Sequence, residues 1–334
     1  MEKITMLGAS NSGKTCFIYA MYDFMQKPQN GFTFITNDPD VDMDLIEGWD
    51  SIAFDGIWPN GTQQTSYYDF TVSFKSAPIM EFSWCDYRGG AITDRSTQND
   101  VDELHQRIFD SECLIVCIGA DTIQEILLES NQYGRESRKG LELKRLNNLI
   151  LRFAVKTQRR IPIIFTLTKA DLYTAQEQRQ LLSVIEKYFS ALYEEGAGWL
   201  FAVVPVTLGQ FEKNSEGDNN IRGVVAPKNI HVPVMFFLHS ILKERIRNIQ
   251  NRLRGISTDK NRYRQEIEHN NGRTWWDKFW NGDNTEVIGS KIGELNKEEQ
   301  NISSQLKDLE IAFGNMKDMF DVCKIFYEGK PMTF

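Results

Sequence analysis

Residues 8–15 read Gly8-Ala9-Ser10-Asn11-Ser12-Gly13-Lys14-Thr15 and fit the pattern G-x-x-x-x-G-K-T. The octet follows the short apolar run 4–7 and precedes a helix-like stretch that begins CFIYAMYDFM. A strand, a glycine-rich loop and a helix N-terminus in this order make a cradle of inward-pointing backbone N–H groups, to which the helix dipole adds partial positive charge. The octet therefore predicts a phosphate-binding loop at the carboxyl end of a strand.

Each polar side chain of this loop has an expected role. Lys14 is expected to reach the β- and γ-phosphates of a nucleotide, and the Thr15 hydroxyl to take one coordination site on Mg²⁺. Gly8 and Gly13 allow the backbone torsions that aim the N–H groups inward. The residues expected to bind phosphate are Gly8, Ser10, Asn11, Ser12, Gly13, Lys14, Thr15 and Cys16.

Strand-like and helix-like segments alternate beyond the loop. The expected strands are 67–74, 79–84, 113–118, 161–167 and 200–206. The expected helices are 41–54, 101–109, 141–156 and 175–194, and Asp38-Pro39 is a typical start for the first of them. Alternation of this kind predicts an α/β fold with a doubly wound, mostly parallel sheet, which binds ligands at the carboxyl ends of its strands.

Composition sets the limits for function. The 334 residues are 41% hydrophobic and 25% charged, which excludes wholesale disorder. A net charge of −8 argues against a general nucleic-acid partner. Five cysteines, an odd number, favour reduced thiols, and the opening MEKITMLG lacks a signal-peptide pattern. We therefore expect a cytoplasmic protein.

Further motifs make residues 1–245 resemble the Ras-like G domain of the P-loop GTPases. Asp86-Tyr87-Arg88-Gly89 fits the D-x-x-G pattern of that family. The resemblance implies that Asp86 holds Mg²⁺ through water and that the Gly89 amide meets the γ-phosphate.

A third motif concerns the base of the nucleotide. Thr168-Lys169-Ala170-Asp171 matches the family pattern [NT]-K-x-D. The Asp171 carboxylate can accept from guanine N1–H and the 2-amino group, a pair that adenine lacks, and the Lys169 stem would cover the base. An alternative interpretation makes Asp171 only the N-cap of the following helix. Thr207 and Leu208 resemble the loop whose backbone meets the guanine oxygen.

Guanine nucleotide, as GTP or GDP, is accordingly the expected ligand, with Mg²⁺. ATP is the alternative, because ATPases share the first loop. Those ATPases usually carry an apolar run that ends in Asp-Glu, whereas Asp86 is followed by Tyr87.

The switch threonine should lie in the loop before the second strand. Thr62 and Thr65 both qualify, and Thr62 is preferred because the loop Pro59-Asn60-Gly61 can swing. The expected metal ligands are then Thr15, Thr62 and Asp86. The expected catalytic residues are Lys14, Thr62, Gly89 and Asn11.

One departure from the family concerns hydrolysis. Many Ras-like proteins place a glutamine after the glycine of D-x-x-G to orient the attacking water, whereas this chain has Gly90. Some related GTPases carry asparagine at the position of Asn11 and bind K⁺ there, which would neutralise charge at the β–γ bridge. Alternatively, Asn11 only shapes the loop, or Arg88 or Arg95 supplies the charge. Two functions remain open: a slow or stimulated GTPase, and a nucleotide-loaded scaffold that does not hydrolyse.

The C-terminal part, 246–334, is expected to form an arm. Apolar residues recur at alternating spacings of four and three at Leu242, Ile246, Ile249, Leu253 and Ile256, with Tyr263 and Ile267 beyond. A second such seam comprises Ile288, Ile292, Leu295, Ile302, Leu306, Leu309, Phe313, Met316, Phe320 and Cys323. This 3.5-residue period predicts an antiparallel helical hairpin, or coiled coil. Lys260 and Glu299 interrupt the two seams at matching heights, and we expect them to form an ion pair.

The expected tip of the arm, 274–282, is rich in aromatic residues, with Trp275, Trp276, Phe279 and Trp280. A two-helix hairpin cannot bury all of them, so the tip is expected to contact a protein partner. Peripheral contact with a membrane surface is a second interpretation. A third is that these residues cap the hairpin or fold back onto the nucleotide-binding domain.

Overall fold

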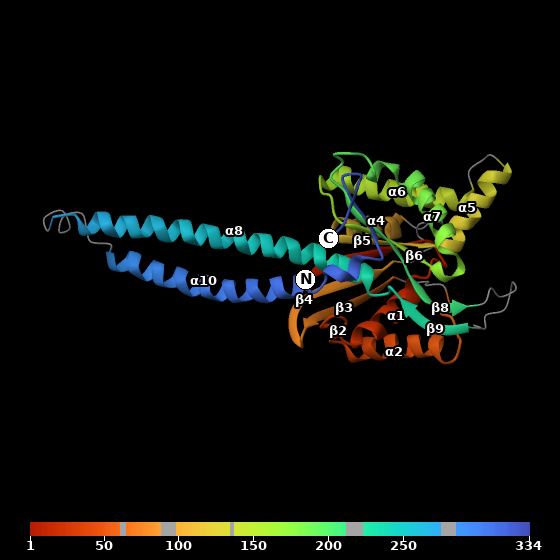
Figure 1. Ribbon diagram of the computed structural model, residues 1–334, viewed down its shortest axis with the longest axis horizontal. Coiled ribbons are helices and arrows are strands. Elements are labelled where there is room, and N and C mark those ends of the chain that lie inside the picture. Colours follow the sequence, from red (N-terminus) through yellow and green to blue (C-terminus); the bar gives the residue numbers. More distant parts are fainter. Residues whose placement is uncertain (61–64, 88–97, 134–136, 212–222, 275–284) are drawn as a thin grey trace. The chain divides into compact units, whose positions relative to one another are not determined.

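A sheet of nine strands forms the centre of the computed structural model, which describes residues 1–60, 65–87, 98–133, 137–211, 223–274 and 285–334 (Figure 1). Its strands are β1 (Glu2–Leu7), β2 (Phe32–Thr36), β3 (Ser66–Phe74), β4 (Ala77–Asp86), β5 (Cys113–Gly119), β6 (Ile163–Thr168), β7 (Leu200–Pro205), β10 (Lys324–Tyr327) and β11 (Lys330–Met332). Their order across the sheet is β11-β10-β7-β6-β5-β1-β4-β3-β2.

The middle of the sheet is parallel and its edges are antiparallel. β1 pairs in parallel with both β4 and β5, and the parallel pairing continues through β6 to β7. β3 and β2 extend one edge, and β10 and β11 extend the other, all by antiparallel pairing. The expected doubly wound, mostly parallel α/β sheet is confirmed.

Helices cover both faces of this sheet. They are α1 (Lys14–Gln26), α2 (Pro39–Ala53), α4 (Gln98–Phe109), α5 (Ala120–Tyr133), α6 (Arg138–Thr157), α7 (Ala175–Tyr188) and the start of α8 (Val232–Asn271). Phe17 of α1 and Phe237 of α8 pack against Trp84 and Phe82 of β4, so both helices lie on one face. α4 to α7 share one buried apolar cluster with the opposite side chains of the strands.

Local sequence signals explain several element ends. The Asp38 side chain accepts from the Asp40 and Val41 amides at 3.0 and 3.4 Å, and Pro39 occupies the first position of α2, as its sequence predicts. Lys75 and Ser76 both have positive φ, as the two central residues of a tight hairpin turn between β3 and β4 require.

The arm is a pair of long helices, α8 and α10 (Thr285–Gly314). The Lys260 Nζ donates to Glu299 Oε2 at 2.7 Å, and Gln250 donates to Glu310. Lys260 follows Gln250 along α8, whereas its partner Glu299 precedes Glu310 along α10. The two helices are therefore antiparallel. Both the expected hairpin and the expected ion pair are confirmed.

The chain divides into two compact units, residues 1–237 with 318–334, and residues 238–317. We expected the arm to continue to residue 334, but α10 ends at Gly314 and the last residues return to the sheet as β10 and β11. Phe320 therefore leaves the expected seam and packs against Phe236 and Phe334. The α-helical period persists in the sequence beyond 314, but pairing with β7 and aromatic packing decide the structure.

Besides β10 and β11, four elements of the described residues were not expected: β2, α5 and the separate hairpin of β8 (Thr207–Phe211) and β9 (Gly223–Lys228). The aromatic tip of the arm, with Trp275, Trp276, Phe279 and Trp280, lies outside the described residues. Among the helices of the described residues, none is both long and apolar enough to cross a membrane.

Candidate functional site

The glycine-rich loop lies between β1 and α1, and its backbone conformation requires glycine. Gly13 has φ +82°, a left-handed conformation that side chains disfavour. A Cβ on Gly8 would come within 2.5 Å of Ser12 Oγ and 2.6 Å of the Cys117 carbonyl oxygen. Asn11 also adopts a left-handed φ of +65°, which asparagine tolerates better than most residues. The loop therefore has little freedom to accept other residues at its glycines.

Lys14 is almost fully buried at the start of α1. Its ammonium donates to the carbonyl oxygens of Gly8 and Ala9 at 2.9 and 3.1 Å. Burial lowers the pKa of Lys14, and the nearby charge of Asp86 opposes that change. A cation held in this way within a turn of backbone N–H groups can bind an anionic group that enters the loop.

Asp86 ends β4 beside Thr15, in a position suited to a metal ion. Thr15 Oγ1 donates to Asp86 Oδ2 at 3.3 Å. Asp86 Oδ1 is buried and has no hydrogen-bond partner among the described residues. Burial raises the pKa of Asp86 to about 6, although Lys14 and Thr15 act in the opposite direction. A hydroxyl next to a buried carboxylate oxygen with no partner is a donor set that fits Mg²⁺ and its water.

The motif 168–171 is tied to the phosphate loop by direct contacts. The Thr168 hydroxyl is buried and donates to the Ser12 carbonyl oxygen at 2.7 Å. The following residue, Lys169, has φ +56°, and its Nζ forms an ion pair with Asp121 Oδ2 at 2.6 Å. Asp121 belongs to the first turn of α5, close behind β5. A side chain from the end of β5 therefore positions Lys169, which follows β6.

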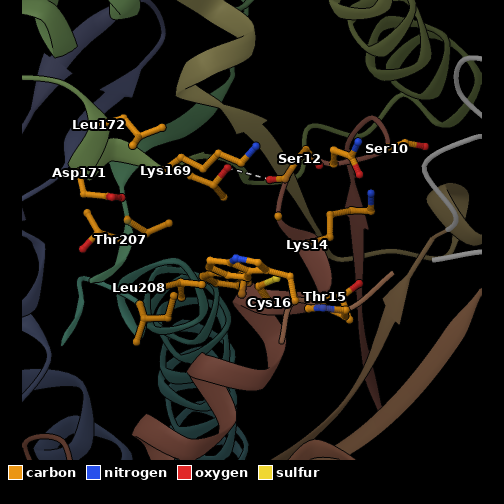
Figure 2. Close-up of a pocket in the computed structure, with 18 of the residues that line it drawn as sticks. Ser10, Ser12, Lys14, Thr15, Cys16, Lys169, Asp171, Leu172, Thr207 and Leu208 are labelled. Atoms are coloured by element: carbon orange, nitrogen blue, oxygen red, sulfur yellow. Dashed lines mark hydrogen bonds between the residues drawn. The ribbon is translucent and has the colours of Figure 1, made fainter. Parts of the chain in front are cut away.

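These loops enclose a cavity of about 380 Å³. Figure 2 shows Asp171, Thr207 and Leu208 at one end of this cavity. Ser10 and Lys14 lie at the other end. A ligand that fills the cavity would thus meet a carboxylate at one end and the phosphate loop at the other.

The structure brings most of the expected nucleotide-binding residues together. The cavity lining includes Ser10, Asn11, Ser12, Gly13, Lys14, Thr15, Cys16, Thr168, Lys169, Asp171, Thr207 and Leu208. Gly8 and Asp86 lie beside it without lining it. Thr62 and Gly89 lie outside the described residues, as do Arg88, Gly90 and Arg95. The described alternative, Thr65, immediately precedes β3. The roles of all these residues remain predictions.

Several lining residues were not expected from the sequence. Trp58, Pro59 and Asn60, which follow α2, contribute to the cavity. The sequence placed Pro59 and Asn60 in the loop expected to swing, but it assigned none of the three residues a role in binding. Asp121 was also missed, although its place after the buried strand β5 is the signal that could have identified it, since ligands of such sheets bind where strands end.

Comparison with known proteins gives one match over most of the nucleotide-binding unit. The profile of the family described as DO-GTPase2, Double-GTPase 2, matches residues 2–198, more than half of the chain. No curated protein matches the chain.

The solved structures that match part of the chain, at low identity, include several GTP-binding proteins. A small COPII coat GTPase SAR1 from Encephalitozoon cuniculi, in complex with GDP, has 12% identity and a TM-score of 0.28, over 57% of this chain and 60% of that one. The S. cerevisiae Ski7 GTPase-like domain, bound to GTP, has 17% identity and a TM-score of 0.35, over 67% and 47%. A probable GTP-binding protein engB has 14% identity and a TM-score of 0.31, over 61% and 88%.

Proposed function

The chain belongs to the Double-GTPase 2 family, and from this premise we propose that its cavity binds GTP and GDP with Mg²⁺ and that it hydrolyses GTP. The observation that carries the proposal is the convergence of three motifs on one cavity. Lys14 of the phosphate loop and Asp171 of the T-K-x-D motif both line it, and Asp86 lies beside Thr15. Phosphate, metal and base would each find a chemically suited partner.

Selection of guanine is assigned to Asp171. Its carboxylate has two acceptor oxygens, and guanine presents two adjacent donors, N1–H and the 2-amino group. Lys169 is restrained by Asp121, so its aliphatic stem can cover one face of the base while the ammonium stays paired. Adenine offers no matching pair of donors on this edge and would leave the carboxylate without partners.

The phosphate side of the cavity supplies electrostatic stabilisation. On binding a triphosphate, Lys14 would exchange its backbone acceptors for phosphate oxygens, and the loop N–H groups would donate to the same anion. Thr15 and Asp86 would hold Mg²⁺, which when bound neutralises phosphate charge. Water then displaces GDP from the γ-phosphorus, and the bond to the β–γ bridging oxygen breaks.

Turnover is proposed to be slow, or stimulated by K⁺ or a partner, because Gly90 offers no side chain to orient water. Asn11 lines the cavity on the phosphate loop, where a side-chain oxygen could help to hold K⁺. Phosphate release from GTP should be measured with K⁺ and with Na⁺, in the wild-type chain and in Asn11→Ala. Faster release in K⁺ that Asn11→Ala removes would support this role, and equal rates in both ions would exclude it.

The second candidate function is a nucleotide-loaded scaffold without hydrolysis, which the glycine at position 90 favours. The two candidates differ in one observation. Purified protein that retains GTP and releases no phosphate, with or without K⁺, would establish the scaffold. Retained GDP together with measurable phosphate release would establish the enzyme.

We further propose that the arm couples nucleotide state to a protein partner, in the cytoplasm or at a membrane surface. The support is the sequence of its tip, which has more large aromatic residues than a two-helix hairpin can bury: Trp275, Trp276, Phe279 and Trp280. The variant Trp275→Ala/Trp280→Ala should lose a partner in pull-down, or contact with anionic vesicles, while its GTP affinity stays unchanged. Unaltered capture and vesicle binding would assign the tip a structural role.

A further inference from the structure

The face of α2 that points away from the sheet is acidic and partly apolar. Leu45, Trp49 and Ile52 are buried in the unit. The opposite face, at helical spacing, presents Asp40, Met43, Asp44, Glu47, Asp50 and Phe54, all exposed. Within the described residues, no lysine or arginine forms an ion pair with its carboxylates, and residues 28–74 contain no Lys, Arg or His at all.

Phe54 and Met43 make this acidic face unusual. Phe54, at the end of α2, is 83% exposed, and Met43 is 60% exposed. A solvated face that served only solubility would not need a phenylalanine in water, because exposure of its ring costs hydrophobic free energy. The alternation of carboxylates with large apolar side chains instead has the composition of an interface.

α6 presents the complementary pattern. Residues 138–160 contain eight Lys or Arg and one acidic residue, Glu142. Arg138, Leu141, Arg145, Arg152, Val155 and Lys156 lie on one exposed face at helical spacing. Val155 is 73% exposed and Leu141 47%. Basic and large apolar side chains thus alternate along α6 as acidic and apolar ones do along α2.

A cavity lies beside this face, between α4 and α6, with a volume of about 620 Å³. Phe109 and Phe153 line it, with rings stacked at 6.2 Å between centroids. Lys156 Nζ lies 4.1 Å from the centre of the Phe109 ring, and Arg152 also lines the cavity. An apolar cavity with cationic groups at its rim fits an aromatic anchor flanked by carboxylates.

Within one molecule the two faces cannot meet. α2 contacts α1 and β2, the last strand at one edge of the sheet. α6 contacts α4, α5 and α7 (Figure 1). Its buried side chains join the apolar cluster over β5, β6 and β7. Each face is therefore available to another molecule.

We propose that the exposed face of α6, with the cavity beside it, binds the exposed face of α2 from a second copy of this chain. Asp44 and Glu47 would pair with the cations of α6, and Phe54 would enter the cavity beside Phe109. The contact is heterologous, since it joins two different surfaces, and a pair of bound copies still leaves one α2 face and one α6 face open. The proposal does not depend on nucleotide binding.

The test is sedimentation velocity of the full chain over a concentration series, in low and high salt. The wild-type chain should self-associate, and salt should weaken the association because exposed charges are screened. Charge reversal on α6 (Arg152→Glu/Lys156→Glu) and on α2 (Asp44→Lys/Glu47→Lys) should each weaken self-association by roughly tenfold or more. Reversal of Arg179 and Lys187 on α7 gives the same change in net charge and should leave it unchanged.

Mixing two variants that each lack one set of charges, Arg152→Ala/Lys156→Ala on α6 and Asp44→Ala/Glu47→Ala on α2, distinguishes this contact from every symmetric one. The first variant keeps its α2 face, and the second keeps its α6 face. At a concentration at which each variant alone is monomeric and melts like the wild type, an equimolar mixture should form a one-to-one complex that does not grow. A wild-type chain that stays monomeric throughout the series would overturn the proposal, even if it bound anionic vesicles. A mixture with no complex would overturn it as well.

Discussion

At the scale of residues, Lys14 and Asp86 are two opposite charges removed from water at the same edge of the sheet. Burial lowers the pKa of Lys14 and raises the pKa of Asp86, which disfavours both charges. In the opposite directions, Asp86 raises the pKa of Lys14, and Lys14 lowers the pKa of Asp86, so each favours the charged form of the other. Such a pair is a poor source of stability, because desolvation offsets much of its attraction. Its arrangement is better explained by the anion and the metal ion that the two groups could hold.

Replacement of Lys14 by Ala should weaken triphosphate binding by at least about a hundredfold, or about 2.7 kcal/mol, because the buried cation is lost from the phosphate loop. Isothermal titration calorimetry with GTP measures this. Lys3→Ala is the matched control, because Lys3 is a half-exposed lysine that pairs with Asp110 away from the cavity. Normal GTP affinity in Lys14→Ala would show that the loop does not bind the phosphates.

His231 predicts a pH dependence of stability. Burial lowers its pKa from 6.5 to about 4, and its ring stacks on Phe24 with 5.1 Å between centroids. In the unfolded chain, His231 therefore binds a proton as the pH falls through about 6.5. In the folded chain it does so only near pH 4. The stability contributed by neutral His231 is present above pH 6.5 and declines as the pH falls, by up to about 2 kcal/mol at pH 5.

His231→Phe keeps a stacking ring and removes the titration. Urea unfolding at several pH values should show a smaller loss of stability between pH 6.5 and 4.5 for this variant than for the wild-type chain. His239, whose pKa is also lowered to about 4, is present in both proteins and cancels in the comparison. Identical pH profiles would contradict the assignment to His231.

Much of the candidate site was predictable at this scale, because its residues form local motifs. Asn11, Lys14 and Thr15 lie within one octet, and Asp171 lies within one quartet. Trp58 and Asp121 belong to no such motif, and only the place of Asp121 after a buried strand could have pointed to it. Whether Trp58 lines the cavity and Asp121 meets Lys169 depends on where α2 and β5 end in space.

At the scale of elements, the arm shows how two polar positions fix the register of a hairpin. Lys260 is 11% exposed in its side chain and Glu299 38%, so their ion pair is partly shielded from water. A slip of α10 along α8 by one turn would separate these charges and misalign both apolar seams. The seams predicted the hairpin, and the charges predicted its register.

A double-mutant cycle on this pair tests the register. Lys260→Glu and Glu299→Lys should each destabilise the chain, and the double variant should recover most of the loss, with a coupling of roughly 0.5–1 kcal/mol. Urea unfolding followed by circular dichroism measures it. The same cycle on Arg252 and Glu298, which are 54% and 39% exposed, should give a smaller coupling. Equal couplings would argue against a special role for Lys260.

The elements that the sequence did not predict are short or depend on distant partners. β10 and β11 have four and three residues, and only the pairing of β10 with β7 and of β11 with β10 makes them strands. The apolar period of α10 continues through Phe320, so the local pattern favoured a longer helix. Long-range pairing replaced that preference once the chain could reach the sheet edge.

At the scale of the whole molecule, the net charge of −8 conceals a separation of charge between surfaces. α2 carries only acidic charges, while α6 is strongly basic. α2 also leads directly to Trp58, which lines the nucleotide cavity, so the proposed contact between copies and the proposed nucleotide site are close in sequence. The composition alone could not reveal this separation, because it averages over the surface.

The central claim, a guanine-specific nucleotide site, is tested most directly by titrating GTP, ATP and XTP into the wild-type chain and Asp171→Asn in the presence of Mg²⁺. The wild-type chain should bind GTP at least roughly a hundredfold more tightly than ATP. Asp171→Asn should lose GTP affinity and gain affinity for XTP, because the asparagine amide can donate to the oxygen that replaces the 2-amino group. Equal affinities for GTP and ATP, or an Asp171→Asn variant with unchanged preference, would contradict the claim.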